Sequence, residues 1–373
     1  MAGADRRNLG SLQRCRSSLS AADGRIAYGS RGGPAGGIAP AHRFPVLDAP
    51  AASSSPAAAP APVATRKPLI PRAELAALNQ LRDGPAWIRL ISHLLTIAAG
   101  GLIWGQQAWP LALRLAGLLL CGVGLATCFA GLHECSHRTA FRSRDLNDGV
   151  AWLLGLLSFY NATAYRRYHQ WHHRYTHQPG LDPELDDPVP TTAAAYLLEI
   201  SGWHWWRGKL AGFRRLLWGD LSALLYLSPE AIPAVRRSAW LQVGVYGVLA
   251  AVSLIGANGF LLWFWLLPLA VGQPFLRFVL LAEHSGCSFS TDGTTNTRTT
   301  LTVWPVRWLM WNMPFHAEHH LFASIPFHAL PAAHRHLAPH LQHIDPGYLA
   351  VHLQLLANLP ALALPTAPGQ QPA

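Results

Sequence analysis

Residues 110–137 read PLALRLAGLLLCGVGLATCFAGLHECSH, an apolar stretch that ends in two histidines four residues apart. Its first part, residues 110–132, has the length of about 20 residues that a helix needs to cross the hydrocarbon core of a bilayer. If the helix continues, His133 and His137 lie on one face, about one turn apart. The stretch therefore predicts a membrane-spanning helix that carries two imidazoles to the membrane surface.

Three further segments, residues 87–104, 239–257 and 260–282, are similarly apolar and nearly as long. Short links join the first two and the last two spans, which predicts two helical hairpins. Over the 373 residues, 50% are hydrophobic and only 13% are charged, about half the charged share of an average soluble domain. We therefore expect an all-α integral membrane protein, with four transmembrane helices as two hairpins.

The basic residues predict how these hairpins are oriented. Residues 105–109 and 258–259 contain no Lys or Arg, whereas residues 133–238 contain twelve. Because loops rich in Lys and Arg stay on the cytosolic side, the long central loop, both termini and the residues after 282 should be cytosolic. Within that loop, the mixture of Trp and Arg over residues 193–226 predicts a helix lying in the headgroup plane.

The two ends of the chain differ in composition from the middle. Residues 1–75 are rich in Ala, Pro, Ser and Arg with almost no apolar periodicity, and we expect a disordered leader there. Residues 76–350 should form the membrane domain, and residues 351–373 a C-terminal tail. The net charge of +10 is scattered and forms no contiguous basic stripe, so we expect an anionic lipid or substrate and no nucleic acid as partner.

Two further histidine clusters share one spacing. HQWHH at residues 169–173 and HAEHH at residues 316–320 both place histidines at positions i, i+3 and i+4, on one side of a helix. Both clusters lie beside predicted spans, and HECSH does so too. Chance does not explain this repetition, so the three clusters predict a metal site. Eight converging imidazoles exceed what one tetrahedral ion uses, which implies two metals. We therefore expect a cytosolic helical cap on the two hairpins that carries a histidine-rich site for two metals. An all-nitrogen site with open positions favours iron that activates dioxygen over a closed structural zinc site.

HECSH, HQWHH and HAEHH, in this order around two hairpins, resemble the three histidine boxes of the membrane fatty-acid desaturase superfamily. The resemblance covers roughly residues 85–345, and the runs NTRTT at 296–300 and WNMPF at 311–315 are similar to its bacterial branch, including rhizobitoxine-type desaturases. It implies a non-haem di-iron centre, and His284 stands where the family often adds a further histidine. The catalytic metal ligands that it implies are His133, His137, His169, His172, His173, His284, His316, His319 and His320.

The resemblance also implies a dioxygen-dependent oxidoreductase that introduces a double bond into a fatty-acyl or related lipid chain. A hydroxylase or an olefin-forming fatty-acid decarboxylase would use the same site, because the box sequences alone do not fix the outcome. The sequence contains no C-x-x-C pair and no His-Pro-Gly-Gly haem signature, so electrons should come from an external ferredoxin or cytochrome b5 with its reductase. We expect a multi-pass protein of the bacterial inner membrane, or of the endoplasmic reticulum or an organelle membrane in a eukaryote.

Two functions of other classes use histidines without this chemistry. A metal transporter should have its ligands near the middle of the spans, where this sequence has essentially none. A zinc membrane hydrolase would hold zinc and would need no dioxygen.

Acidic residues beside the boxes are expected to orient the imidazoles. Glu134, Glu283 and Glu318 each adjoin a box histidine, and the acidic turn at residues 182–187 either has the same role or is solvated. Leu280 stands where acyl-CoA desaturases commonly have an Asn near the metals. Asn312 has either a comparable role or a helix-capping one.

Overall fold

A computed structural model describes residues 68–186 and 189–362 of the chain. These residues are mostly helical, and one pair of short parallel strands, β1 (Arg298–Thr300) and β2 (His343–Asp345), places Arg298 opposite His343. The helices are α1 (Arg72–Leu78), α2 (Asp83–Gly105), α3 (Leu111–His137), α4 (Arg144–Leu157), α5 (Ala162–Tyr175), η1 (Pro183–Asp186), α6 (Ala193–Ile200), α7 (Trp203–Trp218), α8 (Ile232–Ile255), η2 (Leu262–Leu266), α9 (Leu267–His284), α10 (Trp304–Leu309), α11 (His316–Leu321), α12 (Leu330–Leu337), η3 (Ala338–His340), α13 (Tyr348–Ala357) and η4 (Leu359–Leu362).

Four helical segments among the described residues are long and apolar enough to cross a membrane: α2, α3, α8 and the continuous segment η2–α9. They confirm the four predicted spans and the all-α membrane fold. α3 continues without a break to His137, so both histidines of HECSH are helical. α8 begins at Ile232, earlier than the predicted residue 239, because Pro233 suits the first turn of a helix.

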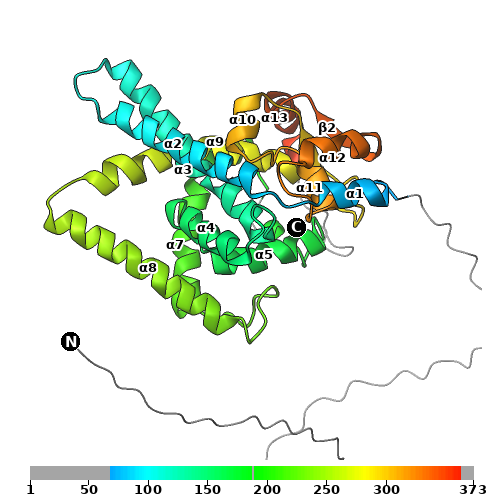
Figure 1. Ribbon diagram of the computed structural model, residues 1–373, viewed down its shortest axis with the longest axis horizontal. Coiled ribbons are helices and arrows are strands. Elements are labelled where there is room, and N and C mark those ends of the chain that lie inside the picture. Colours follow the sequence, from blue (N-terminus) through cyan, green and yellow to red (C-terminus); the bar gives the residue numbers. More distant parts are fainter. Residues whose placement is uncertain (1–67, 187–188, 363–373) are drawn as a thin grey trace, which may run out of the picture. The chain divides into compact units, whose positions relative to one another are not determined.

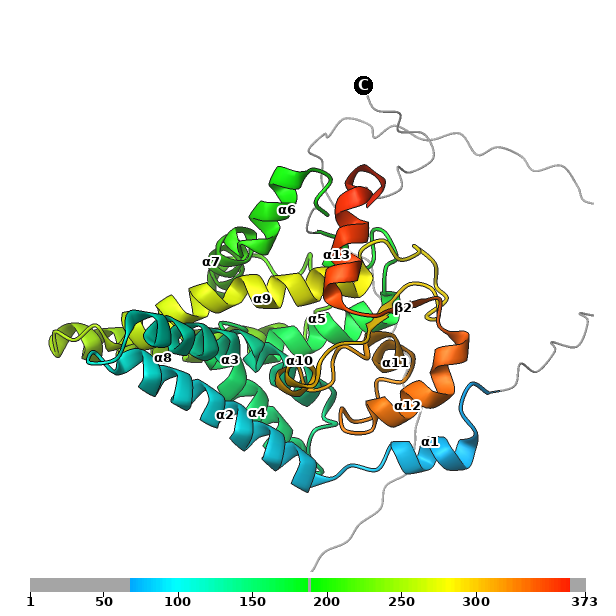
Figure 2. The ribbon, with the colours of Figure 1, turned by 90° about the horizontal axis from the view of Figure 1, so that it is seen from above.

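The two hairpins point the same way within residues 68–362 (Figures 1 and 2). Both views show the turn between α2 and α3 and the turn between α8 and α9 at one end, with α11 and α12 toward the other. The C-terminal ends of α3 and α9 therefore lie on the side that carries α5 and α11. This arrangement brings the histidine-rich stretches together.

α3 is the central helix. Nearly all of its residues from Gly117 to Ser136 are buried, and it packs against α2, α4 and α9. α8, in contrast, buries only Val235, Ala239 and Gln242. Because lipid chains are as apolar as leucine side chains, the exposed apolar surface of α8 suits contact with lipid.

α3 and α9 approach each other closely at two glycines. A Cβ atom at Gly122 would collide with the carbonyl oxygen of Pro268, and one at Gly272 would collide with the carbonyl oxygen of Gly122. Small residues allow such close approach of membrane helices. The crossing fixes the separation of the two helices, and so it positions His133 and His137 relative to His284.

The segment after α9 folds back over the end of that helix. Arg298 is buried and donates to Asp345 on β2 at 2.9 Å and to the carbonyl oxygen of Ser285 at 2.8 Å. One side chain thus joins β1, β2 and the end of α9. The chain then reaches α11 through a turn in which Trp311 and Asn312 have positive φ angles of 50° and 57°.

The membrane domain is wider than residues 76–350. Residues 1–67 of the predicted leader lie outside the described residues, but α1 begins at Arg72, and Ile70 is buried in a cluster with Phe315 and Leu330. At the other end, α13 continues to Ala357, with Val351 buried. The structure therefore has helical residues on both sides of the predicted boundaries, in segments too short to show a clear apolar period. Residues 363–373 of the predicted tail lie outside the described residues.

The Trp-rich stretch at residues 193–226 contains two helices rather than the single helix expected. α6 and α7 are separated at Gly202, whose φ angle of +78° ends one helix and starts the next. Glycine adopts this left-handed conformation without the strain that a Cβ atom causes. The position of these helices in the headgroup plane stays a prediction.

We expect Gly122→Ala to destabilise the protein, because the added methyl group must push α3 away from Pro268. Overpacking of this kind costs about 1–3 kcal/mol. The thermal unfolding midpoint of the purified protein in detergent should therefore fall. Gly244→Ala on α8 is the matched control, since a Cβ atom there meets nothing within 4 Å. Equal midpoints for the two variants would contradict a tight α3–α9 crossing.

Candidate metal centre

The nine predicted histidines come from four helices whose ends meet. His133 and His137 lie at the C-terminal end of α3, and His284 is the last residue of α9. The N-terminus of α5 is capped by Asn161, whose side chain accepts from the Ala164 amide. α5 carries His169, His172 and His173, and α11 carries His316, His319 and His320.

The structure brings these side chains together in two groups. In each group, one ring nitrogen from every member lies within 4.8 Å of the others. His316 adjoins the second group, because its Nε2 is 3.1 Å from the Nε2 atoms of both His284 and His320. We therefore define the first group as His133, His137, His169, His173 and His319, and the second group as His172, His284, His316 and His320.

The spacing of the ring nitrogens fits the binding of metal ions. Nε2 of His173 lies 3.0 Å from Nε2 of His169 and 3.1 Å from Nε2 of His319. Two nitrogens that bind one ion at about 2.1 Å and at right angles are about 3.0 Å apart. The Nε2 atoms of His133 and His137 are buried without a hydrogen-bond partner, which costs free energy unless another group completes them. Both groups thus fit transition metals that prefer imidazole.

Hydrogen bonds on the far side of the rings orient the second group. Nδ1 of His172 lies 2.9 Å from Oδ1 of Asp182. Nδ1 of His284 lies 3.1 Å from the carbonyl oxygen of Asn296, and Nδ1 of His320 lies 3.1 Å from the Thr176 hydroxyl. A ring that donates from Nδ1 presents the lone pair of Nε2 to a metal. The outer hydrogen bonds therefore point three Nε2 atoms inward.

Burial keeps most of these imidazoles neutral. The pKa values of His169, His173 and His319 are held well below the usual value, first by desolvation and then by repulsion from neighbouring imidazoles. The same causes lower the pKa values of His316 and His320. Neutral imidazole is the form that binds metals. The sites are therefore in a binding-competent protonation state at neutral pH.

His172 is the exception in this electrostatic pattern. Burial alone would lower its pKa, but the negative charge of Glu184 and the hydrogen bond to Asp182 outweigh desolvation and raise it. Asp182 is itself buried, and its carboxylate also accepts from the His177 amide at 2.6 Å. The acidic turn is thus part of the site at Asp182, while Asp187 lies outside the described residues.

Two carboxylates border the second group directly. Glu283 Oε2 is 3.4 Å from Nε2 of His316, and Glu184 Oε2 is 3.6 Å from Nε2 of His172. Glu318 is fully buried and accepts from Thr299 and His334. Glu134 accepts from the Phe327 amide at 3.1 Å. Sequence reasoning singled out all four acids, and they lie beside the histidines or anchor the elements that carry them.

Several residues of the site were missed in the sequence. Thr176 gave no signal, and His334 lacks the spacing of the three histidine clusters; each acts through one hydrogen bond across a long sequence separation. Asn296 and Thr299 belong to the NTRTT run, whose family-like character was the available signal. Asn312 donates to the Phe327 carbonyl oxygen at 3.0 Å and holds a turn. That contact assigns it neither the metal-side role nor the capping role considered for it.

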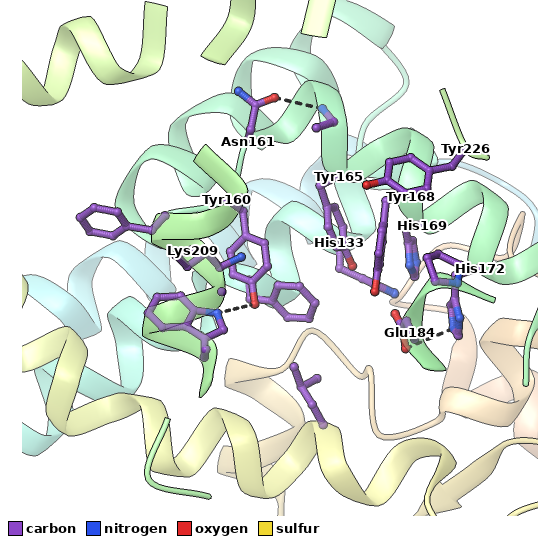
Figure 3. Close-up of a pocket in the computed structure, with 18 of the residues that line it drawn as sticks. His133, Tyr160, Asn161, Tyr165, Tyr168, His169, His172, Glu184, Lys209 and Tyr226 are labelled. Carbon is purple, nitrogen blue, oxygen red and sulfur yellow. Dashed lines mark hydrogen bonds and ion pairs between the residues drawn. The ribbon is translucent and has the colours of Figure 1, made fainter. Parts of the chain in front are cut away.

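A cavity of about 540 Å³ leads to the histidines from α7. At one end it is lined by His133, His169, His172 and His316. Figure 3 shows Tyr160 and Lys209 on one side of this space and His169, His172 and Glu184 on the other, with Tyr165 between them. Aromatic rings form much of the wall: Tyr160 and Tyr165 both pack against Phe129. The cavity is large enough for a small organic molecule or part of a lipid chain.

The four apolar helices and the converging histidines agree with a known family of membrane proteins. Residues 73–352 match the family described as fatty acid desaturase, and the chain belongs to this family.

The chain is similar to curated desaturases from animals and bacteria. It is 28% identical over 225 residues to sphingolipid delta(4)-desaturase/C4-monooxygenase DES2 of Rattus norvegicus, covering 56% of this chain and 60% of that protein. It is 28% identical over 268 residues to dihydrorhizobitoxine desaturase of Bradyrhizobium elkanii, covering 65% and 70%. It is 25% identical over 278 residues to sn-1 oleoyl-lipid 12-desaturase of Synechocystis, covering 67% and 74%. The chain thus spans about 60% of the length of the rat and mouse relatives.

Asp182→Asn should weaken metal binding, because the neutral amide accepts a weaker hydrogen bond from Nδ1 of His172 and holds that ring less firmly. Loss of such an outer partner typically lowers metal affinity about 10-fold to 100-fold. The metal retained by purified protein after dialysis against a chelator measures this. Asp220→Asn is the matched control, since Asp220 is exposed and bonds to Ser222. Equal metal loss in both variants would argue against a role of Asp182 at the site.

Proposed function

We propose that this protein is a membrane-bound, dioxygen-dependent oxidoreductase that introduces a double bond into a fatty-acyl or related lipid chain, using two irons. One observation carries the proposal: an aromatic-walled cavity ends on two groups of converging, mostly neutral imidazoles. Membership of the fatty acid desaturase family supports it.

The first group would hold one iron and the second group the other. Bound iron would supply the oxidising power to break an unactivated C–H bond, which no acid or base side chain can do. The outer hydrogen bonds from Asp182, Asn296 and Thr176 keep the rings in place for this role. The all-imidazole character of the first group favours iron over a closed structural zinc site, which is often completed by Cys.

The chain's own residues position the substrate and manage protons. Phe129, Tyr160 and Tyr165 form a wall that holds an extended chain and keeps water out. Glu184 and Glu283 border the second group and can hold protons beside it. Desaturation removes two hydrogens from adjacent carbons; with two further electrons and two protons, one dioxygen becomes two waters. The electrons come from an external ferredoxin or cytochrome b5 with its reductase.

The positive-inside pattern supports a multi-pass orientation with the site on the cytosolic side. The membrane is a bacterial inner membrane, or that of the endoplasmic reticulum or an organelle in a eukaryote. This orientation rests on the twelve Lys and Arg residues between 133 and 238. An electron-transfer protein with an acidic surface could dock on such a basic face.

Hydroxylation is the second candidate outcome at the same site, in which an oxygen atom is inserted instead of a second hydrogen being removed. The name of the rat relative combines a desaturase with a monooxygenase, which supports keeping both reactions. An olefin-forming decarboxylase would also use this site. The identity of the product separates the three.

The test is a lipid and hydrocarbon profile of cells that express the wild type, His172→Ala or His319→Ala. We expect a new unsaturated product in the wild type and its loss, to background, in both variants, because each removes one imidazole from a different group. Purified wild-type protein should contain about two irons per chain. A hydroxylated or chain-shortened product would instead select one of the other two oxidative reactions.

His340→Ala serves as the control, since His340 is exposed and lies in η3, outside both groups. It should keep the wild-type profile and the wild-type iron content. Stoichiometric zinc with an unchanged lipid profile would overturn the oxidative proposal and favour a zinc hydrolase.

A further inference from the structure

Arg277 is a charged residue inside the fourth membrane-spanning segment, and it lines the cavity described above. It precedes His284 by seven residues on α9, which is about 10 Å along a helix axis. A charged side chain within a membrane span is costly and marks a functional site unless a partner neutralises it. The partners of Arg277 therefore decide what it does.

Those partners leave most of the guanidinium unused. Arg277 Nη2 donates to the Tyr160 hydroxyl at 3.3 Å, and the same hydroxyl accepts from Trp205 Nε1 at 2.9 Å. Arg277 Nε is buried without a hydrogen-bond partner. None of the ion pairs that arginines form in residues 68–186 and 189–362 includes Arg277. A guanidinium has five N–H donors, so this one is equipped to bind an acceptor that enters the cavity.

The two ends of the cavity differ in charge. At the end of the cavity near Tyr160, Lys209 Nζ lies 3.1 Å from the centre of the Tyr160 ring. Arg277 donates a hydrogen bond to the Tyr160 hydroxyl at the same end. Glu199 also lines the cavity. At the histidine end, the carboxylate of Glu184 lies 3.6 Å from Nε2 of His172. A ligand with an anionic group is therefore attracted to Arg277 and repelled from the histidine end.

We propose that the substrate carries an anionic group, a carboxylate or a phosphate, that binds Arg277 within the cavity. The carbon presented to the histidines then lies close to this group, rather than far along an apolar chain. This inference rests on the proposed function for the reaction itself. The planar guanidinium can bind either anion through two parallel hydrogen bonds, and the short span of α9 between Arg277 and His284 sets the distance.

The proposal predicts that the distance between the anionic group and the oxidised carbon is constant. In substrates of different chain length, the oxidised carbon should stay at one distance from the anion, because Arg277 and His284 are fixed on the same helix. A substrate anchored by its apolar end would instead keep a constant distance from the methyl terminus.

Binding is tested with three probes that share one chain: dodecanoate, dodecyl phosphate and dodecanol. The full-length, iron-loaded protein in lipid nanodiscs is titrated by calorimetry, with empty nanodiscs as the blank. We expect Arg277→Gln to weaken binding of the preferred anion about 10-fold to 100-fold, as loss of charge-assisted hydrogen bonds does, and to leave dodecanol unchanged. Arg277→Lys should retain part of the affinity. The tighter of the two anionic probes identifies carboxylate or phosphate as the natural group.

Arg237→Gln is the matched control, because it removes the same charge from an exposed position on α8 outside the cavity. Wild-type iron content in every variant shows that the fold is intact. Unchanged anion affinity in Arg277→Gln, or an equal loss for dodecanol, would overturn the inference. The binding result is separate from turnover: selective anion binding without any oxidised product would reject the proposed function, whereas oxidised product without an effect of Arg277→Gln would reject only this inference.

Discussion

The rest of the structure depends on a group of imidazole rings packed against one another away from solvent. Their nitrogens come from α3, α5, α9 and α11 and converge to within hydrogen-bonding distance of each other. Polar atoms buried in this way destabilise a fold unless something completes them. Burial suppresses protonation of most of these rings, with His172 as the exception, so a metal is the natural partner for their lone pairs.

Two kinds of contact hold the imidazole rings in position. The glycine contact between α3 and α9 fixes the separation of two membrane helices, and thereby of His133 and His284. Hydrogen bonds then set the rotation of individual rings, as Asp182 does for His172. The glycine crossing is a backbone contact in the apolar part of the protein. The ring hydrogen bonds are made by polar groups beyond the spans. A change in either moves nitrogen atoms that a metal requires within a few tenths of an ångström.

Charged side chains are also arranged in a fixed order along the cavity. Arg277 lies on the same helix as His284 but bonds to Tyr160, while Glu283 borders the second group from one position before that histidine. One helix thus carries a cation, a carboxylate and an imidazole along the path from the cavity to the metal centre. This order connects recognition of a substrate to the place where it would react.

The sequence by itself predicted the four spans and eight of the nine histidines, because bilayer length and the i, i+4 and i, i+3, i+4 spacings are local properties of the chain. His284 was predicted only through the family resemblance. It did not determine the break between α6 and α7, the extent of α1 and α13, or the partners Thr176 and His334. Only the tertiary structure divided the histidines into two groups and turned Arg277 toward Tyr160. Such contacts join residues far apart in the chain, and their geometry depends on how helices cross, which no local pattern encodes.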